Sequence, residues 1–228
     1  MSDFKIQKLI WDSTFFGFEI GKIEVNNIKD DKSFKNLIEK SSFQMIQIFS
    51  KNDISKLIGL KPIDIKLTYA KNPSMIKNYN NIKTEDRDLD QKLYSLARQA
   101  GKFSRYNLDF KLKIKFKLMY KIWMKKSLER DLADEVFVHK NGNIINGMVT
   151  VKKSFNYAKI GLIAVDKMSQ SKGVGSQLLD RVENWALNQN LENIFVDTQK
   201  ENFVACKFYE KNRFNLSETI YIYHVWKN

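Results

Sequence analysis

Hydrophobic residues recur along the chain at two periods, which together predict a mixture of short strands and helices. In the first third, runs rich in β-branched and aromatic residues predict strands near residues 4–11, 18–25, 43–50 and 63–69. Amphipathic segments at residues 32–40 and 54–60 predict helices between those strands. This order of elements predicts a small α/β domain over residues 1–75.

A polar stretch separates this region from the rest of the chain. It begins with Asn72-Pro73-Ser74 and contains asparagines at positions 78, 80 and 81. Proline and clustered asparagine interrupt helices and strands, so this composition predicts a linker and a second domain over residues 76–228. The sequence Thr-Glu-Asp-Arg-Asp at residues 84–88 supplies capping groups before a helix predicted at residues 89–100.

The lysine-rich segment at residues 111–117 is open to two interpretations. Its alternation, Lys-Leu-Lys-Ile-Lys-Phe-Lys, is typical of a strand. Apolar residues at positions 112, 116, 119, 120 and 123 also form a helical stripe. We favour a helix for the whole run to residue 124, because the part after residue 117 does not alternate.

The remaining pattern predicts hairpins followed by alternating helices and strands. Alternating runs at residues 135–139 and 144–153 flank Asn141-Gly142, which is typical of a β-hairpin. A strand at residues 159–165 precedes a helix that extends to about residue 190. The expected buried stripe of this helix is Val174, Leu178, Val182 and Trp185. The last elements are a strand, a helix and one or two strands, at residues 194–198, 202–211 and 214–226.

The composition is that of a globular protein, because 43% of the 228 residues are hydrophobic and 13% are aromatic. No apolar stretch approaches the ~18 residues that span a bilayer, and no basic leader precedes an apolar run, so we expect neither a span nor a signal peptide. Cys206 is the only cysteine, which excludes an internal disulfide and favours a cytoplasmic location. With His139 and His224 it offers no zinc-type spacing, so we expect no metal.

The formal charge of +13 allows two kinds of partner. A basic surface is typical of nucleic-acid-binding proteins. It also suits an enzyme that captures anionic small molecules. Lys, Asn and Ile are abundant throughout the chain, which indicates a general bias of composition. We therefore expect small-molecule substrates, with no nucleic-acid or membrane partner.

A glycine turn between a predicted strand and a predicted helix is the strongest chemical signal. Its sequence is Gln170-Ser171-Lys172-Gly173-Val174-Gly175-Ser176. The backbone N–H groups that open a helix attract anions, and glycine lets a phosphate approach closely. A Walker loop is absent, and a dinucleotide fingerprint fails because Leu178 stands at its third glycine. On local grounds, a tight turn without a ligand stays an alternative.

Two paired motifs resemble those of the GNAT superfamily of N-acetyltransferases. They are Gln170-x-x-Gly173-x-Gly175 and Asn202-x-x-Ala205-x-x-Phe208-Tyr209-Glu-Lys, within residues 135–226. The resemblance implies an α/β GNAT fold, with a mixed, mostly antiparallel central sheet flanked by helices. It also implies acyl-coenzyme A as the donor. The cofactor-binding residues that it implies are Ile163, Ala164, Val165, Gln170, Ser171, Lys172, Gly173, Val174, Gly175, Ser176, Asn202 and Phe208.

The second motif is consistent with a groove for a pantetheine arm. Asn202 and Tyr209 are seven residues apart, which places them on one helix face about 10 Å apart along the axis, with the small Ala205 between them. The chain departs from the family where a glycine usually precedes Phe214. We expect Asn212 to take the left-handed conformation that ends the helix.

Further motifs resemble the bacterial dTDP-amino-sugar N-acyltransferases, such as the enzymes that acetylate dTDP-fucosamine. They are Trp-Asp-Ser-x-Phe-Phe-Gly at residues 11–17, Ser-Arg-Tyr-x-x-Asp at residues 104–109 and Leu-x-Tyr-x-x-Trp at residues 118–123. The substrate residues implied are Ser104, Arg105, Tyr106, Asp109, Tyr120 and Trp123. An Arg can grip a diphosphate bidentately. Core packing of the aromatic residues stays an alternative, and Trp11, Phe15 and Phe16 are expected to pack between the two domains rather than to contact a ligand.

The resemblance implies direct acyl transfer without an acyl-enzyme. Tyr209 would protonate the departing thiolate as general acid, and a backbone N–H from residues 163–165 would stabilise the oxyanion. The base is open among Asp166, Asp197, Gln199 and water. Cys206 points about 100° away from the Asn202 face, which argues against a nucleophilic role.

The expected function is N-acylation of a dTDP-linked amino-dideoxy sugar for surface polysaccharide. The acyl chain, the position of the amine and the oligomeric state, including a homodimer across an edge strand, are left open. The alternatives are an acyltransferase of protein N-termini or lysines, and a non-catalytic nucleic-acid-binding module.

Overall fold

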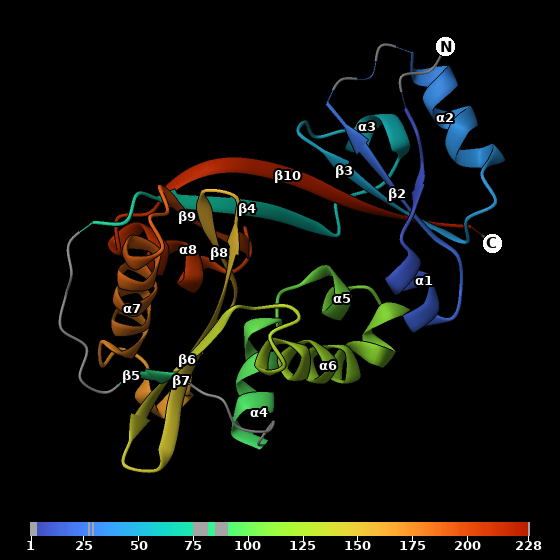
Figure 1. The fold of residues 1–228 in the computed structure, drawn as a ribbon. Helices are drawn as coiled ribbons and strands as arrows, with labels where there is room; N and C mark the ends of the chain where they lie inside the picture. The colour runs from blue at the N-terminus through green and yellow to red at the C-terminus, as the bar shows by residue number, and fades with distance from the viewer. Residues whose placement is uncertain (1–3, 27, 29, 75–81, 85–90, 228) are drawn as a thin grey trace. The chain divides into compact units, whose positions relative to one another are not determined.

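The computed structural model describes residues 4–26, 28, 30–74, 82–84 and 91–227, and its contacts divide the chain into two units (Figure 1). Unit 1 comprises Met1–Leu67, Gln199–Glu201 and Glu218–Asn228, and unit 2 comprises Thr68–Thr198 and Asn202–Ser217. The boundary predicted between residues 75 and 76 lies outside the described residues, as do the asparagines at 78, 80 and 81 and the capping residues 85–88. These expectations stay predictions.

The described residues of unit 1 form a small sheet and three helices. Its strands are β1 (Gln7–Lys8), β2 (Ile20–Val25), β3 (Met45–Ser50) and the part of β10 (Asn215–Trp226) from Glu218 onward. Its helices are α1 (Ile10–Phe16), α2 (Asp31–Lys40) and α3 (Ser55–Ile58). β2 and β3 are parallel, while β10 runs antiparallel to β3 from Tyr221↔Ser50 to Trp226↔Met45. The C-terminus therefore completes a core begun by the N-terminal strands.

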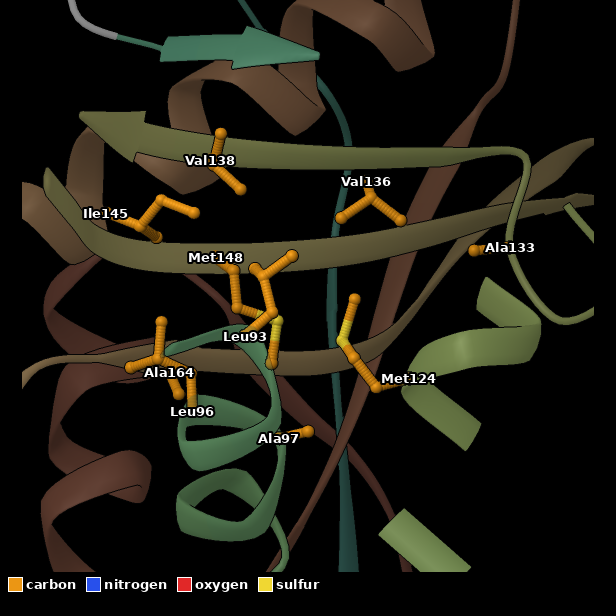
Figure 2. Packing of buried hydrophobic residues seen from close by; sticks show 10 residues of the cluster. All are labelled: Leu93, Leu96, Ala97, Met124, Ala133, Val136, Val138, Ile145, Met148 and Ala164. Atoms are coloured by element: carbon orange, nitrogen blue, oxygen red, sulfur yellow. The ribbon is translucent and has the colours of Figure 1, made fainter. Parts of the chain in front are cut away.

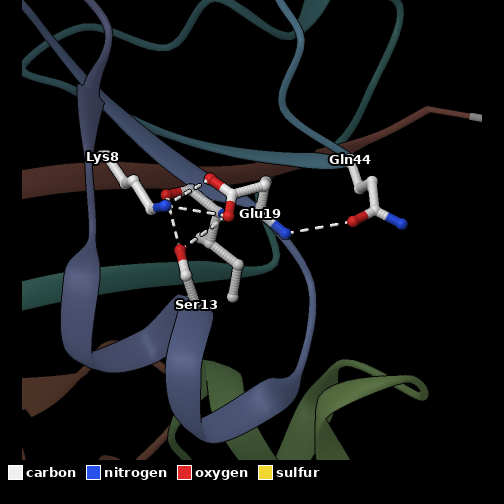
Figure 3. A network of polar contacts seen from close by, with 5 residues as sticks. Lys8, Ser13, Glu19 and Gln44 are labelled. Carbon is white, nitrogen blue, oxygen red and sulfur yellow. Dashed lines mark hydrogen bonds and ion pairs between the residues drawn. The ribbon is translucent and has the colours of Figure 1, made fainter.

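Only Gln7–Lys8 of the strand predicted at residues 4–11 forms, so most of this prediction is wrong. α1 begins at Ile10 and ends at Gly17, which has a left-handed φ of 87° that glycine adopts without strain. Ser13 of this helix exchanges hydrogen bonds with the backbone of Ile20, receiving the Ile20 N–H at 3.0 Å (Figure 3). The serine of the residue 11–17 motif thus has a structural role, which is to fix α1 to β2.

Unit 2 contains the strand order β4-β9-β8-β7-β6-β5. The bounds are β4 (Asp64–Lys71, which begins in unit 1), β5 (Ile82–Thr84), β6 (Glu135–Asn141), β7 (Ile144–Ser154), β8 (Tyr157–Val165) and β9 (Asn193–Gln199). β5 to β8 pair antiparallel in succession, and β8 pairs parallel with β9. The predicted mixed, mostly antiparallel sheet is confirmed, as is the hairpin at Asn141-Gly142.

Helices cover both faces of this sheet. They are α4 (Gln91–Ala100), α5 (Arg105–Leu108), α6 (Phe116–Leu128), α7 (Val174–Asn188) and α8 (Phe203–Lys211). Leu96 of α4 and Met124 of α6 pack on Met148 of β7 (Figure 2). Phe137 points to the opposite face, where the Arg181 guanidinium of α7 lies 4.2 Å from its ring centre. All four residues of the stripe predicted for α7 are buried.

The lysine-rich segment is helical, as favoured, although its first part is tighter than an α-helix. Leu112–Lys115 form a 3₁₀ turn that continues into α6. Leu112, Met119 and Met124 are fully buried, which explains why the helical stripe prevails over the two-residue alternation. None of the described helices is both long and apolar enough to cross a bilayer.

We predict that Leu96→Ala lowers the free energy of unfolding by about 2–5 kcal/mol, because it leaves a cavity between α4 and the sheet. Leu96 is 2% exposed, whereas Leu216 is 54% exposed. The matched control Leu216→Ala should change stability by less than about 0.5 kcal/mol. Urea titrations followed by circular dichroism measure both, and equal losses would contradict the packing described.

Candidate active site

The candidate site begins where two neighbouring strands part. β8 and β9 pair in parallel only from Tyr157↔Asn193 to Ile160↔Val196, yet β8 continues to Val165 and β9 to Gln199. The register of β8 against β7 shifts at the same level, between Val149 and Val151. A shift of this kind bends a strand and re-aims its backbone. The end of β8 is therefore directed away from its parallel neighbour.

The direction of the β8 backbone groups follows from their partners. Leu162 N–H donates to Thr150 Oγ1 at 2.9 Å and Asp166 N–H donates to Asn146 O at 2.7 Å, both on β7. Because backbone groups alternate along a strand, those of Ile163 and Val165 face the opposite side, toward the gap. Val165 O accepts from the Gln99 side chain at 2.7 Å and from the Gln170 side chain at 3.1 Å. The Ile163 N–H is thus the donor whose direction fits the expected oxyanion role.

The glycine turn leads into the first turn of α7. Ser171 has φ 61° and Gly173 has φ 82°, so the chain reverses twice before the helix. Gly173 is the N-cap and no side chain caps the helix, while the first helical bond is Gln177 N–H to Gly173 O at 3.1 Å. The N–H groups of residues 174–176 precede that bond. With the exposed Lys172 beside them, they fit an anionic group such as a pyrophosphate.

Gly175 brings the two sequence motifs into contact. A Cβ on Gly175 would lie 2.9 Å from Cε2 and 3.0 Å from Cζ of the Phe208 ring. The α7 and α8 helices can pack this closely only because Gly175 has no side chain. The predicted cofactor residues 173–176 and Phe208 are therefore neighbours, and Tyr209 follows directly.

Tyr209 lies in an aromatic cluster and is 3% exposed. Its ring centre is 5.4 Å from that of Phe208, 5.7 Å from Tyr69 and 5.9 Å from Phe214. Burial raises the pKa of the Tyr209 hydroxyl well above its usual value, and the nearby Cys206 and Asp197 raise it further. The phenol therefore keeps its proton, as a general acid requires.

Tyr69 is a neighbour of Tyr209 that the sequence did not indicate. It comes from β4, and its hydroxyl donates to Glu210 Oε1 at 2.9 Å. Burial raises the pKa of Tyr69, and Glu210 and Cys206 contribute to the shift. β4 and α8 are far apart in the sequence, so no local sequence pattern could indicate that Tyr69 lies beside Tyr209.

Asn202 is the N-cap of α8, and its Oδ1 accepts the Ala205 N–H at 3.3 Å. This cap leaves the amide nitrogen of Asn202 for the expected ligand contact. At the other end of α8 the expectation for Asn212 is wrong. Asn212 keeps φ −89° and donates its side-chain amide to Phe208 O, while Arg213 takes the left-handed conformation with φ 64°. That position costs a non-glycine residue roughly 1 kcal/mol.

Two of the acidic groups near the site, Asp166 and Asp197, are engaged in ion pairs. A hydrogen bond from Lys92 at 2.6 Å lowers the pKa of Asp166. Asp197 accepts from Thr68 Oγ1 at 2.7 Å and from Lys159 Nζ at 2.6 Å. Burial raises the pKa of the Cys206 thiol, which opposes thiolate formation. Because Asp166 and Asp197 are paired with lysines, we expect water rather than either carboxylate to accept the proton of the attacking amine.

The residues predicted to bind the acceptor form one packed cluster. Tyr106 and Tyr120 are buried, with ring centres 5.7 Å and 5.0 Å from that of Trp123. Arg105 Nη2 donates to Tyr106 Oη at 2.8 Å. Asp109 Oδ1 accepts the backbone N–H groups of residues 111 and 112, at 2.9 Å and 3.2 Å.

These contacts assign Asp109 a local structural role, which is to start the 3₁₀ turn. Ser104 Oγ is buried and has no hydrogen-bond partner within the described part of the chain. Contacts of all six residues with a substrate stay predictions. Among the described residues, no three His, Cys, Asp or Glu side chains gather to hold a metal ion.

The sequence model of the acetyltransferase (GNAT) family matches residues 100–214, which is half of the chain. The chain belongs to the GNAT acetyltransferase family. Its donor is therefore expected to be the family's acyl-coenzyme A. The glycine turn at residues 170–176, which we call the anion cradle, the separated ends of β8 and β9, and the contact between Gly175 and Phe208 fit that group. Membership of this superfamily, first indicated by the two motifs, is confirmed.

Similar proteins support the family and the fold. Streptothricin acetyltransferase A from Bacillus subtilis (strain 168) is 33% identical over 99 residues, covering 39% of this chain and 57% of that protein. A functionally unknown conserved protein from Staphylococcus epidermidis ATCC 12228 has a TM-score of 0.64 at 13% identity, covering 91% of this chain and 85% of that one. A GCN5-related N-acetyltransferase from Sphaerobacter thermophilus has a TM-score of 0.54 at 11% identity, covering 90% and 73%. The two structures show a shared fold.

We predict that Gly175→Ala destabilises the protein by about 1–3 kcal/mol, because the new methyl overlaps the Phe208 ring. Ser176→Ala, one position further along α7, is the control and should change stability by less than about 0.5 kcal/mol. Chemical denaturation measures both variants. A Gly175→Ala protein as stable as the wild type would show that α7 and α8 do not pack as described.

Proposed function

We propose that this protein transfers an acyl group from acyl-CoA to the amine of a dTDP-linked amino-dideoxy sugar. The observation that carries the proposal is the close contact between Gly175 in the anion cradle and Phe208 in α8, the helix that also contains Tyr209. The end of β8 supplies an N–H directed at the gap beside β9. A phosphate-binding turn, an oxyanion donor and a protonated phenol are the parts that acyl transfer to an amine requires.

Each residue has a distinct task in this proposal. The N–H groups of residues 174–176 hold the pyrophosphate, and acyl-CoA supplies the activated thioester. The Ile163 N–H stabilises negative charge on the acyl oxygen. Tyr209 donates a proton to the leaving sulfur, and water carries the proton of the amine away, because Asp166 and Asp197 are held by lysines.

The acceptor is inferred from residues outside the donor site. The motifs at residues 11–17, 104–109 and 118–123 favour a nucleotide-linked amino sugar. Arg105 is partly exposed, and its guanidinium is suited to a diphosphate. The net charge of +13 attracts an anionic acceptor. We place the reaction in the cytoplasm and in the synthesis of surface polysaccharide, with acetyl as the default acyl group.

Streptothricin is a second candidate acceptor, because the similarity to a streptothricin acetyltransferase is 33% identity over 99 residues. Mass spectrometry of products distinguishes the two. The protein is incubated with acetyl-CoA and a panel of dTDP-amino sugars with amines at C3 or C4, streptothricin, or a lysine peptide. We expect an acetylated dTDP-sugar, and thermal stabilisation by both dTDP and CoA. Acetylation of streptothricin or of the peptide alone would overturn the proposed acceptor.

We predict that Tyr209→Phe lowers kcat by roughly tenfold to a thousandfold, with little change in the dissociation constant of acetyl-CoA, because the general acid is lost. Steady-state kinetics and calorimetry measure the two quantities. Cys206→Ala on the same helix is the control and should remain active. Inactivation of this control would instead indicate a covalent acyl-enzyme.

The raised pKa of Tyr209 gives a pH prediction. An acid whose pKa is raised keeps its proton to higher pH, so kcat should show no alkaline decline from Tyr209 below about pH 10. A pH–rate profile at saturating substrates tests this expectation. A decline between pH 8 and 9 that disappears in Tyr209→Phe would contradict it.

A further inference from the structure

An exposed surface on the lysine-rich segment has no task in the proposed chemistry. Three large apolar side chains occur at intervals of four residues in this segment, and they are 74%, 84% and 51% exposed: Phe110 in the turn before the 3₁₀ helix, Ile114 in the 3₁₀ helix and Leu118 in α6. Lys113, Lys117 and Lys121 in the same segment are exposed as well. We call these six residues the 110–121 surface.

The segment does not need this surface in order to fold. Its other side packs into unit 2 through Leu112, Met119 and Met124, each fully buried. Phe110 and Ile114 therefore stay in water although their neighbours are already anchored. Large apolar side chains grouped on a surface are typical of an interaction site.

The charged side chains of this segment are of one sign. No Asp or Glu occurs between residues 110 and 128. Within the described part of the chain, Lys113, Lys117 and Lys121 form no ion pair. Further along the same helix the lysines do have partners, since Lys125 lies 3.4 Å from Glu129 and Lys126 lies 3.6 Å from Asp131. The three basic side chains of the 110–121 surface are thus available to an external anion.

We propose that the 110–121 surface binds the face of a membrane that contains anionic lipids. Exposed aromatic and aliphatic side chains of such a segment enter the boundary between headgroups and acyl chains, while adjacent lysines pair with lipid phosphates. Nucleic acid would engage the lysines but offers no apolar phase for Phe110 and Ile114. The sequence led us to expect no membrane partner. Binding at a membrane surface differs from that expectation and requires no spanning helix, and none of the described helices could span a bilayer.

Co-sedimentation of the full chain with vesicles tests the proposal. One set of vesicles is phosphatidylcholine alone, and the other is phosphatidylcholine mixed with phosphatidylglycerol. We expect at least tenfold stronger partitioning to the mixed vesicles, and a loss of that preference at high salt. Equal partitioning to both sets, or binding to duplex DNA without binding to mixed vesicles, would overturn the proposal.

Two variants separate the parts of the surface. Lys113→Gln, Lys117→Gln and Lys121→Gln combined should weaken binding to mixed vesicles by about a hundredfold, at roughly tenfold or less per charge. Phe110→Ser with Ile114→Ser keeps every charge and should weaken it by at least tenfold.

The matched control replaces three exposed lysines of α2 (Lys32→Gln, Lys35→Gln and Lys40→Gln), which removes the same charge elsewhere. It should bind like the wild type, and thermal midpoints of all variants verify folding. If the control loses as much binding as the Lys113, Lys117 and Lys121 variant, the vesicles respond to the net charge of the whole protein, and the 110–121 surface is not the binding site.

Discussion

The short parallel pairing of β8 with β9 is the constraint on which the candidate site depends. The two strands are bonded from Tyr157↔Asn193 to Ile160↔Val196 and then continue without that pairing. The same residues of β8 carry a register shift against β7, where Leu162 bonds to the Thr150 side chain. Backbone groups that a continuous sheet would use are thereby turned to a gap. A backbone donor such as the Ile163 N–H is available to a substrate only if it is not used in a hydrogen bond to a neighbouring strand.

The helices α7 and α8 approach each other closely at Gly175. Gly175 allows the first turn of α7 to lie against Phe208, and this places the anion cradle next to the helix that carries Tyr209. The C-terminal end of α8 contains a strained residue in place of a glycine. Arg213 takes a left-handed conformation where the family usually has glycine, and Phe214 N–H still bonds to Tyr209 O at 3.0 Å to complete the helix end. The strained residue Arg213 lies at the C-terminal end of α8, whereas Asn202 caps the N-terminal end.

Local patterns predicted much of this fold, and distant contacts account for the rest. The stripe of α7 and the Asn141-Gly142 hairpin depend on neighbouring residues, so periodicity revealed both. The pairing of β10 with β3 joins residues about 175 positions apart, which no local pattern encodes. Helix α1 was missed because its aromatic residues are equally typical of strands. In the candidate site, the motifs indicated the glycine turn at residues 170–176 and Tyr209, whose ligand contacts stay predictions, while the structure revealed Tyr69 beside Tyr209 and the structural role of Asp109.

We propose that the turn at residues 170–176 holds the pyrophosphate of the acyl donor. Isothermal titration calorimetry compares acetyl-CoA with acetyl-pantetheine, which has the same thioester arm but lacks the pyrophosphate and the adenosine 3′-phosphate. Several charge-assisted hydrogen bonds of about 1.5–3 kcal/mol each would be lost with the pyrophosphate. We expect acetyl-pantetheine to bind at least about a hundredfold more weakly than acetyl-CoA. Equal dissociation constants for the two compounds would contradict it.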